Sequence, residues 1–141
     1  MTSSDATNIA AVVDQLSDEL VAIRRDLHAH PEPSWEEHRT TGVLLDRLRS
    51  AGLDPRTAPT GTGVICDLGT KGPMVALRGD IDALRLYDTK EVPYRSTVEG
   101  VCHACGHDLH ATAVLGAGLA LAEAMAERDA PGRVRLILQP A

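Results

Sequence analysis

The chain is poor in aromatic side chains and in excess positive charge. Its 141 residues include one Trp, two Tyr and no Phe, so they offer few rings on which nucleic-acid bases could stack. Lys and Arg total 14 against 20 Asp and Glu, and the resulting formal net charge of −6 disfavours binding to a phosphate backbone. We therefore expect no nucleic-acid partner.

Long apolar runs, a secretion signal and a disulfide framework are also absent. No apolar run approaches the length of a bilayer span, and the segment Met1–Asp5 lacks the basic and apolar regions of a signal peptide. The three cysteines, Cys66, Cys102 and Cys105, form an odd and sparse set, which does not make such a framework. These features predict a soluble, cytoplasmic protein without a membrane partner, in which cysteines are inert, metal-bound or reactive.

Apolar residues at steps of three and four predict three helices. A regular apolar stripe predicts the first helix over residues 8–27. A second helix is expected to begin at Ser34, with Ser34 and Glu37 as a capping box and Gly52 as its C-terminal cap. A third helix is expected over about 108–128.

Short apolar runs between these helices predict strands. Residues 64–68 and 74–77, joined by the glycine-containing turn 69–72, are expected to pair as an antiparallel hairpin, and residues 134–138 form a last strand. Helices that alternate with strands predict a layered α/β fold. The ends of the second and last strands and the 102–108 loop are then expected to converge.

The densest group of chemically active side chains lies in the segment 102–110, Cys-His-Ala-Cys-Gly-His-Asp-Leu-His. Cys105 and His107 are separated by one glycine, so a sharp turn could point both inward. Thiolate and imidazole are ligands that suit Zn²⁺ and neighbouring transition ions, and His103 and Asp108 could orient such ligands. The spacing favours a metal site.

Two other interpretations of this segment stay open. It could be a polar loop that caps the following helix and exposes its histidines incidentally. Cys102 and Cys105 could also form a C-x-x-C redox pair at a helix start.

Two further polar groups flank the predicted elements. Asp80 and Asp82 follow a strand and could bind or orient a metal, or cap a solvated turn; Asp82 matters only if it meets the Cys105 loop in space. His28 and His30 are expected to be structural residues at a chain reversal, with their imidazoles bonded to backbone. Cys66 is expected to be a small buried apolar residue.

Four segments in this order resemble a known family. They are Leu27–Glu32, Leu77–Leu84, His103–Asp108 and Gln139–Ala141, of which His-Ala-Cys-Gly-His-Asp is specific. Together they resemble the N-terminal portion of the aminoacylase/carboxypeptidase-type metallopeptidase family. The most similar branch is the N-acyl-amino-acid amidohydrolases, which includes the hippurate and auxin-conjugate hydrolases.

The resemblance implies a two-metal hydrolase with a layered, zinc-peptidase-like α/β catalytic domain and an inserted lid domain. It implies that Cys105 and His107 bind divalent ions (Mn, Zn, Co or Ni) and that Asp82, a catalytic residue beside them, helps to orient the site. Asp80 occupies a position that is a metal-binding histidine in more distant relatives. The implied reaction is hydrolysis of the amide bond of an N-acyl amino acid by a metal-activated water.

The resemblance also implies what these residues do not contain. In the family, the Gln-Pro-Ala segment continues into two glutamates, one the general base and one a metal ligand. The later histidine ligands and the lid domain, through which a homodimer could form, are absent too. Residues 1–141 are therefore expected to be the N-terminal part of a catalytic domain with little or no hydrolytic activity alone. A non-enzymatic metal- or partner-binding module and a C-x-x-C redox protein are the alternatives.

Overall fold

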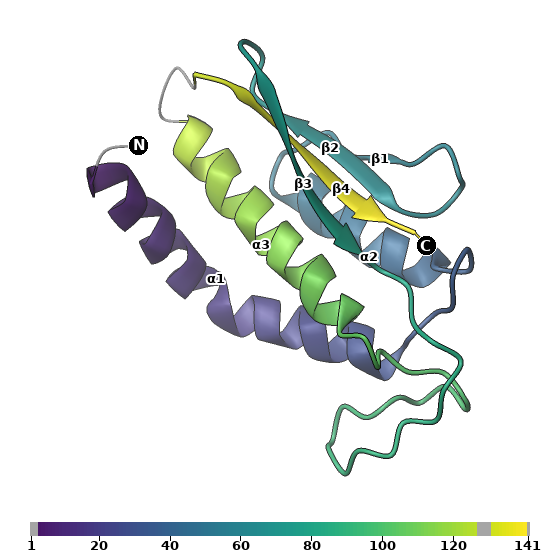
Figure 1. Ribbon diagram of the computed structural model, residues 1–141. Coiled ribbons are helices and arrows are strands. Elements are labelled where there is room, and N and C mark those ends of the chain that lie inside the picture. Colours follow the sequence, from purple (N-terminus) through teal and green to yellow (C-terminus); the bar gives the residue numbers. More distant parts are fainter. Residues whose placement is uncertain (1–2, 127–130, 141) are drawn as a thin grey trace.

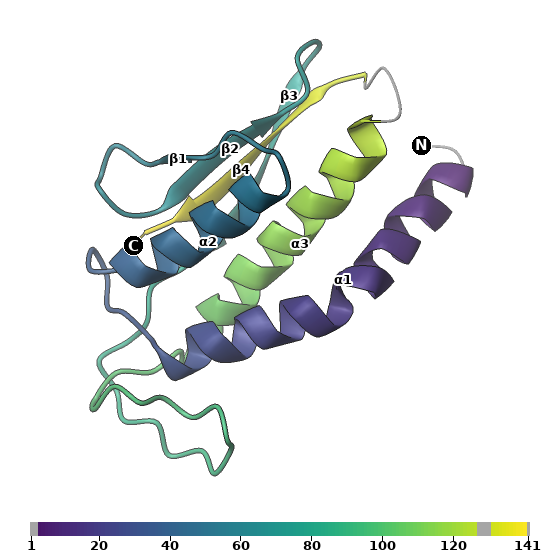
Figure 2. The same ribbon diagram turned by 180° about the vertical axis from the view of Figure 1, so that it is seen from behind.

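The computed structural model describes residues 3–126 and 131–140, and it shows the expected layered α/β arrangement (Figure 1). One face of a four-stranded sheet is covered by two helices, and a third helix packs on the outer side of one of them. Figure 2 shows the same layers from behind. The other face of the sheet carries exposed polar residues such as Asp67 and Arg78.

All three expected helices are present. They are α1 (Ser3–Ala29), α2 (His38–Ser50) and α3 (His107–Ala126). Gly52 has a φ of 77°, the left-handed conformation expected of a C-terminal cap. The expected last two residues of α3, 127 and 128, lie outside the described residues.

The sheet contains β1 (Arg56–Thr57), β2 (Val64–Leu68), β3 (Met74–Asp80) and β4 (Arg133–Gln139) in the order β1-β2-β4-β3. The predicted hairpin between β2 and β3 is wrong, because β4 lies between them, antiparallel to β2 and parallel to β3.

Burial explains why β4 takes the interior position. Leu136 and Leu138 of β4 are fully buried, whereas Val75 of β3 is 61% exposed at the sheet edge. An interior strand buries more apolar surface than an edge strand does, so the more apolar strand occupies the centre.

The start of α2 differs from the predicted capping box. The residue at the N-cap position, Glu37, makes no side-chain capping hydrogen bond; instead the Glu32 carboxylate accepts hydrogen bonds from the amides of Arg39 (2.8 Å) and Thr40 (2.7 Å). Ser34 bonds elsewhere, to Asp82. A carboxylate compensates the unpaired amides and the positive end of the helix dipole more strongly than a hydroxyl does, which favours Glu32 as the cap.

Helix α3 is a core helix that lies between α1 and the sheet. Gly116 faces Leu20 of α1 and Gly118 faces Leu136 of β4, so a side chain at either glycine would collide with its neighbour. Within the described part of the chain, α3 is long and apolar enough to cross a membrane by length and composition. Its buried residues, Asp108 among them, instead contact the sheet and α1.

Candidate metal centre

Three segments that are distant in sequence meet beyond the carboxyl end of β3. The Ile81 amide donates to the Gln139 carbonyl at 3.0 Å, which joins the ends of β3 and β4. Isolated bridges pair Pro33 with Ala83 and the next residue, Leu84, with Cys102. The expected convergence of two strand ends with the 102–108 loop is confirmed.

Gly106 makes the turn that leads into α3. Its φ is 83°, a conformation that favours glycine, and its carbonyl accepts the amides of Leu109 and His110 in the first helical turn. The turn leaves the Cys105 side chain exposed and His107 half-buried. The sharp turn expected between these two residues is present.

The imidazole of His107 is held by a buried carboxylate. His107 Nδ1 lies 2.8 Å from Asp82 Oδ1, and the Ser34 hydroxyl donates to Asp82 Oδ2 at 3.1 Å. An ionised carboxylate only accepts, so Nδ1 carries the proton and the lone pair of Nε2 is available for a metal. The structure therefore brings Asp82 and His107 together, as the metal hypothesis requires.

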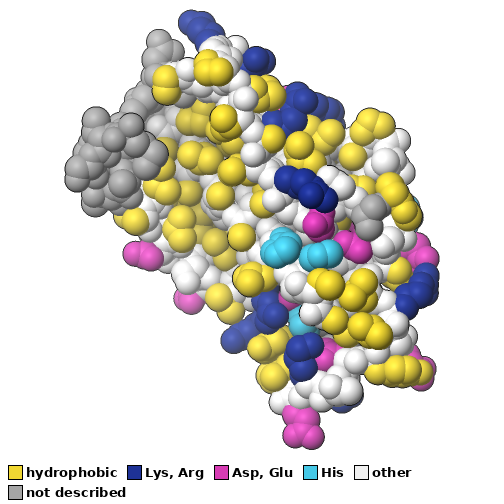
Figure 3. Space-filling model, in the orientation of Figure 1, with side chains coloured by type: hydrophobic (Ala, Val, Ile, Leu, Met, Phe, Trp, Pro, Cys, Tyr) yellow, Lys and Arg dark blue, Asp and Glu magenta, His cyan; other side chains and the backbone are white. Residues whose placement is uncertain are grey.

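Asp80 and His110 join His107 in a group that could hold an ion. Each of the three residues has one potential ligand atom, and these three atoms all lie within 4.8 Å of one another. The two imidazole centroids are 5.3 Å apart. Arg78 donates a hydrogen bond to Asp80 Oδ1 at 2.6 Å. Figure 3 shows histidine side chains on this surface next to acidic and basic ones. Cys105 is not part of this group.

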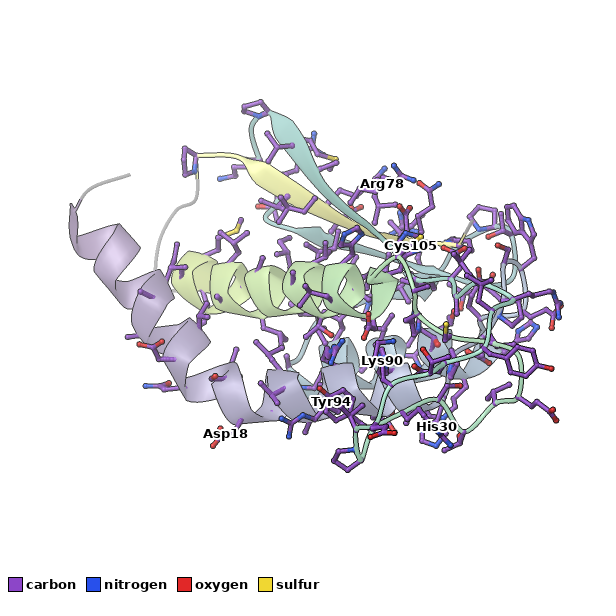
Figure 4. The ribbon with its side chains drawn as sticks, turned by 60° about the horizontal axis from the view of Figure 1, so that its bottom comes forward. Asp18, His30, Arg78, Lys90, Tyr94 and Cys105 are labelled. Carbon is purple, nitrogen blue, oxygen red and sulfur yellow. The ribbon has the colours of Figure 1, made fainter. Side chains whose placement is uncertain are left out.

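Sequence reasoning included His110 in the polar segment 102–110 but assigned it no role as a ligand. A signal was present, because His107 and His110 are three positions apart at the start of a predicted helix and so share one face. Cys105 precedes the helix, and Figure 4 labels it near the carboxyl end of the sheet. The ligand roles predicted for Cys105 and His107, and the role predicted for Asp82, stay predictions.

His103 and Asp108 lie in the interior, away from solvent. They are 4% and 0% exposed. Burial, opposed by the nearby Asp108 carboxylate, lowers the pKa of His103 to about 4, so its imidazole is neutral at neutral pH. Asp108 contacts Arg24 and His28 of α1. Because its carboxylate contacts α1, Asp108 can orient His107 only through the helix backbone.

The two histidines at the end of α1 differ. His30 Nδ1 lies 2.8 Å from the Asp26 carbonyl, the backbone contact expected at a chain reversal. The same expectation is wrong for His28, whose Nδ1 lies 2.7 Å from the Asp108 carboxylate. Burial explains the difference, because His28 is 1% exposed and requires a strong partner.

The cysteines are free thiols in three different environments. Cys66 is fully buried in β2, as expected, and burial raises the pKa of its thiol. Cys102 is buried and Cys105 is exposed. The C-x-x-C hypothesis therefore has one accessible sulfur, which does not favour redox cycling.

Comparisons with known proteins identify related sequences and structures. The sequence profile of Peptidase family M20/M25/M40 matches residues 76–141. A protein of Rhodococcus jostii, provisionally named glutamate–cysteine ligase 2-3, is 52% identical over 86% of this chain and 15% of its own length. The N-acetyl-L-cysteine deacetylase of Bacillus subtilis is 42% identical over 89% of this chain and 30% of its own.

A solved structure shows the same fold. The YXEP protein of Bacillus subtilis, described as a dinuclear metal-binding peptidase of the M20 family, superposes with a TM-score of 0.84 at 38% identity. The match covers 91% of this chain and 36% of that protein. The chain thus spans about a third or less of the length of these relatives. The matched profile, the shared fold and the position of the histidine loop together show that the chain belongs to the M20/M25/M40 peptidase family.

Proposed function

We propose that residues 1–141 form the N-terminal part of the catalytic domain of a metal-dependent amidohydrolase that acts on N-acyl amino acids. Family membership supports the reaction class, and the name of the deacetylase relative supports an N-acyl amino acid as substrate. The description of the YXEP protein supports a site with two divalent ions. The observation that carries the proposal is the 2.8 Å contact between Asp82 and His107, because it prepares one imidazole nitrogen for a metal.

The side chains around His107 fit a divalent transition ion. We assign His107 and Cys105 as ligands, with Asp80 and His110 within reach of the same imidazole. This set supplies nitrogen, sulfur and oxygen donors, which suits Zn²⁺, Co²⁺ and Mn²⁺. Asp82 is buried and hydrogen-bonded on both oxygens, so it orients the imidazole rather than binding the ion.

Each residue then has a limited task in hydrolysis. A bound divalent ion lowers the pKa of its water and polarises the amide carbonyl. Asp82 holds the Nδ1 proton of His107, and Ser34 fixes the second Asp82 oxygen. We propose that the general-base glutamate lies outside these residues, as the resemblance to the family implies, so that they bind metal and contribute little to proton transfer.

Metal titration tests the proposal. The metal-free chain is titrated with Zn²⁺ and Mn²⁺ in a calorimeter, alongside His107→Ala and the control His30→Ala, whose imidazole is partly exposed and outside the site. We expect the unmodified chain and the control to bind and His107→Ala to lose binding. Equal affinity of all three proteins would contradict the proposal.

Cobalt spectroscopy then decides which donors bind. A thiolate ligand produces a thiolate-to-Co²⁺ charge-transfer band, whereas imidazole and carboxylate do not. We expect this band in the unmodified chain and its loss in Cys105→Ser. A spectrum without the band that changes in His110→Ala would instead assign the ion to Asp80, His107 and His110.

Hydrolysis completes the test. N-acetylcysteine and hippurate are incubated with the metal-loaded chain, and the released amino acid is measured. We expect little release by these 141 residues. Substantial release that chelation and Cys105→Ala abolish would show that the chain supplies its own proton acceptor.

A further inference from the structure

Behind the first turn of α3, four polar side chains from three segments lie together, and three of them are buried. They are Arg24 and His28 of α1, Asp88 of the 85–100 loop and Asp108 of α3, which we call the clamp. The side chains of Asp108, His28 and Asp88 are 0%, 1% and 2% exposed. None of the four belongs to the metal-binding group.

Asp108 joins α3 to α1 through two short contacts. One oxygen, Oδ2, lies 2.8 Å from Arg24 Nε and 2.7 Å from His28 Nδ1. Since a carboxylate only accepts hydrogen bonds, His28 Nδ1 is the donor in its hydrogen bond with Asp108. The carboxylate lies in the first turn of α3, where the helix dipole favours negative charge.

His28 extends the clamp to the 85–100 loop. Its Nε2 lies 3.5 Å from Asp88 Oδ2. Burial would raise the pKa of Asp88, but hydrogen bonds from the Ser96 and Lys90 amides and from the Lys90 ammonium outweigh it and hold this pKa well below its usual range. Asp88 is therefore a charged group around which the loop is folded.

The same loop contacts the end of α1 at two more places. The Tyr94 ring lies under the guanidinium groups of Arg24 and Arg25, at 5.3 and 5.1 Å from its centroid, and Figure 4 shows Tyr94 against α1. The Thr97 amide and hydroxyl both donate to the Ala29 carbonyl. The 85–100 loop, α1 and α3 therefore contact one another at one place.

We propose that the clamp positions His107 for metal binding. Asp108 is bonded directly to His107 along the chain, so the contacts of Asp108 fix the backbone from which the imidazole projects, while Asp82 fixes the ring itself. His28 and Asp108 are positioning residues, since neither touches the proposed ion. The inference rests on the proposed function, because it requires that His107 binds a metal.

The test compares metal affinity with stability in the full 141-residue chain. The Zn²⁺ dissociation constant is measured by competition with a chromophoric chelator, and the melting temperature is measured on metal-free protein. Asp108→Asn keeps the shape of the side chain and removes its charge. We expect it to weaken Zn²⁺ binding measurably, but by less than the roughly 10- to 100-fold that is typical when a direct hydrogen-bond partner of a metal ligand is removed. Asp88→Asn, whose contact is longer, should weaken it less.

Asp67→Asn is the matched control. Asp67 makes two hydrogen bonds to Arg135, at 2.6 and 2.7 Å, on the exposed face of the sheet. We expect this variant to bind Zn²⁺ as the unmodified chain does. If Asp108→Asn fails to fold, His28→Asn and Asp88→Asn carry the comparison.

A purely structural clamp predicts a different result. In that case Asp108→Asn and Asp88→Asn lower the melting temperature and leave Zn²⁺ affinity unchanged, which overturns the inference while His107→Ala still upholds the proposed function. Failure of the unmodified chain to bind Zn²⁺ overturns both. A second readout is NMR of ¹⁵N-labelled histidine: we expect single His107 ring signals in the unmodified chain and broadened signals in Asp108→Asn.

Discussion

Two carboxylate–imidazole pairs each include a residue of the first turn of α3, and their contact distances are almost the same. Asp82 and His107 are 2.8 Å apart in the outer pair, whose imidazole is half-buried, and Asp108 and His28 are 2.7 Å apart in the inner pair, whose imidazole is buried. The difference lies at the other ring nitrogen. His107 lies beside half-buried Asp80 and exposed His110 in the candidate metal group, whereas Nε2 of His28 lies 3.5 Å from the buried Asp88 carboxylate.

This comparison shows that the pair itself does not decide the role. A carboxylate on one nitrogen fixes the tautomer of a histidine in both cases. What the second nitrogen meets then makes one histidine a candidate ligand and the other a structural connection. The following predictions test this distinction.

The largest effect is expected in the inner pair. Asp108→Ala leaves Arg24 and buried His28 without their carboxylate, and breaking a buried ion pair costs about 3–5 kcal/mol of stability. Asp80→Ala, which removes an exposed partner of Arg78, should cost less than about 1 kcal/mol. Urea unfolding of the metal-free proteins measures both, and equal losses would contradict the comparison.

The next effect is expected in the outer pair. Asp82→Asn replaces an acceptor with a group that can also donate, so the His107 proton can shift from Nδ1 to Nε2. Nε2 then has no lone pair with which to bind a metal. We expect Zn²⁺ affinity to fall about 10- to 100-fold. Calorimetric titration measures it. Unchanged affinity would show that the tautomer of His107 is fixed by another group.

A smaller effect is expected from pH. Burial lowers the pKa of His103 from 6.5 to about 4, so between these values the unfolded chain binds a proton that the folded chain does not. Stability should therefore fall as the pH drops from about 6.5 towards 4, and His103→Gln should reduce this fall. Urea unfolding at pH 7 and pH 5 checks the sign. Equal pH dependence of the two proteins would mean that other groups cause it.

The smallest effect is expected at Ser34. Its hydroxyl donates one hydrogen bond, 3.1 Å long, to Asp82 Oδ2. Ser34→Ala removes a hydrogen bond that contributes about 1 kcal/mol to holding Asp82 in place. Zn²⁺ affinity should fall by a few-fold, less than in Asp82→Asn. A loss as large as in that variant would make Ser34 as important as the carboxylate.

Local sequence rules predicted the parts of the fold that depend on neighbouring residues. The apolar stripes identified the three helices, and Gly52 ends α2 in the expected conformation. The rules failed where two local partners competed: Ser34 and Glu32 were both near the start of α2, and Glu32 caps it while Ser34 turns to Asp82. Which partner wins depends on Asp82, 48 residues away from Ser34.

The amino-acid sequence by itself determined the three helices, the strands β2, β3 and β4 and the loop that carries the candidate metal ligands, because periodicity, turn residues and ligand types are local properties. It did not predict the two-residue strand β1. The tertiary structure alone decided that β4 separates β2 from β3, that His110 and Asp80 join His107, and that His28 meets Asp108. Each of these contacts joins residues far apart in the chain, apart from the helical neighbours His107 and His110, and depends on burying apolar surface and on pairing the charges that burial leaves inside.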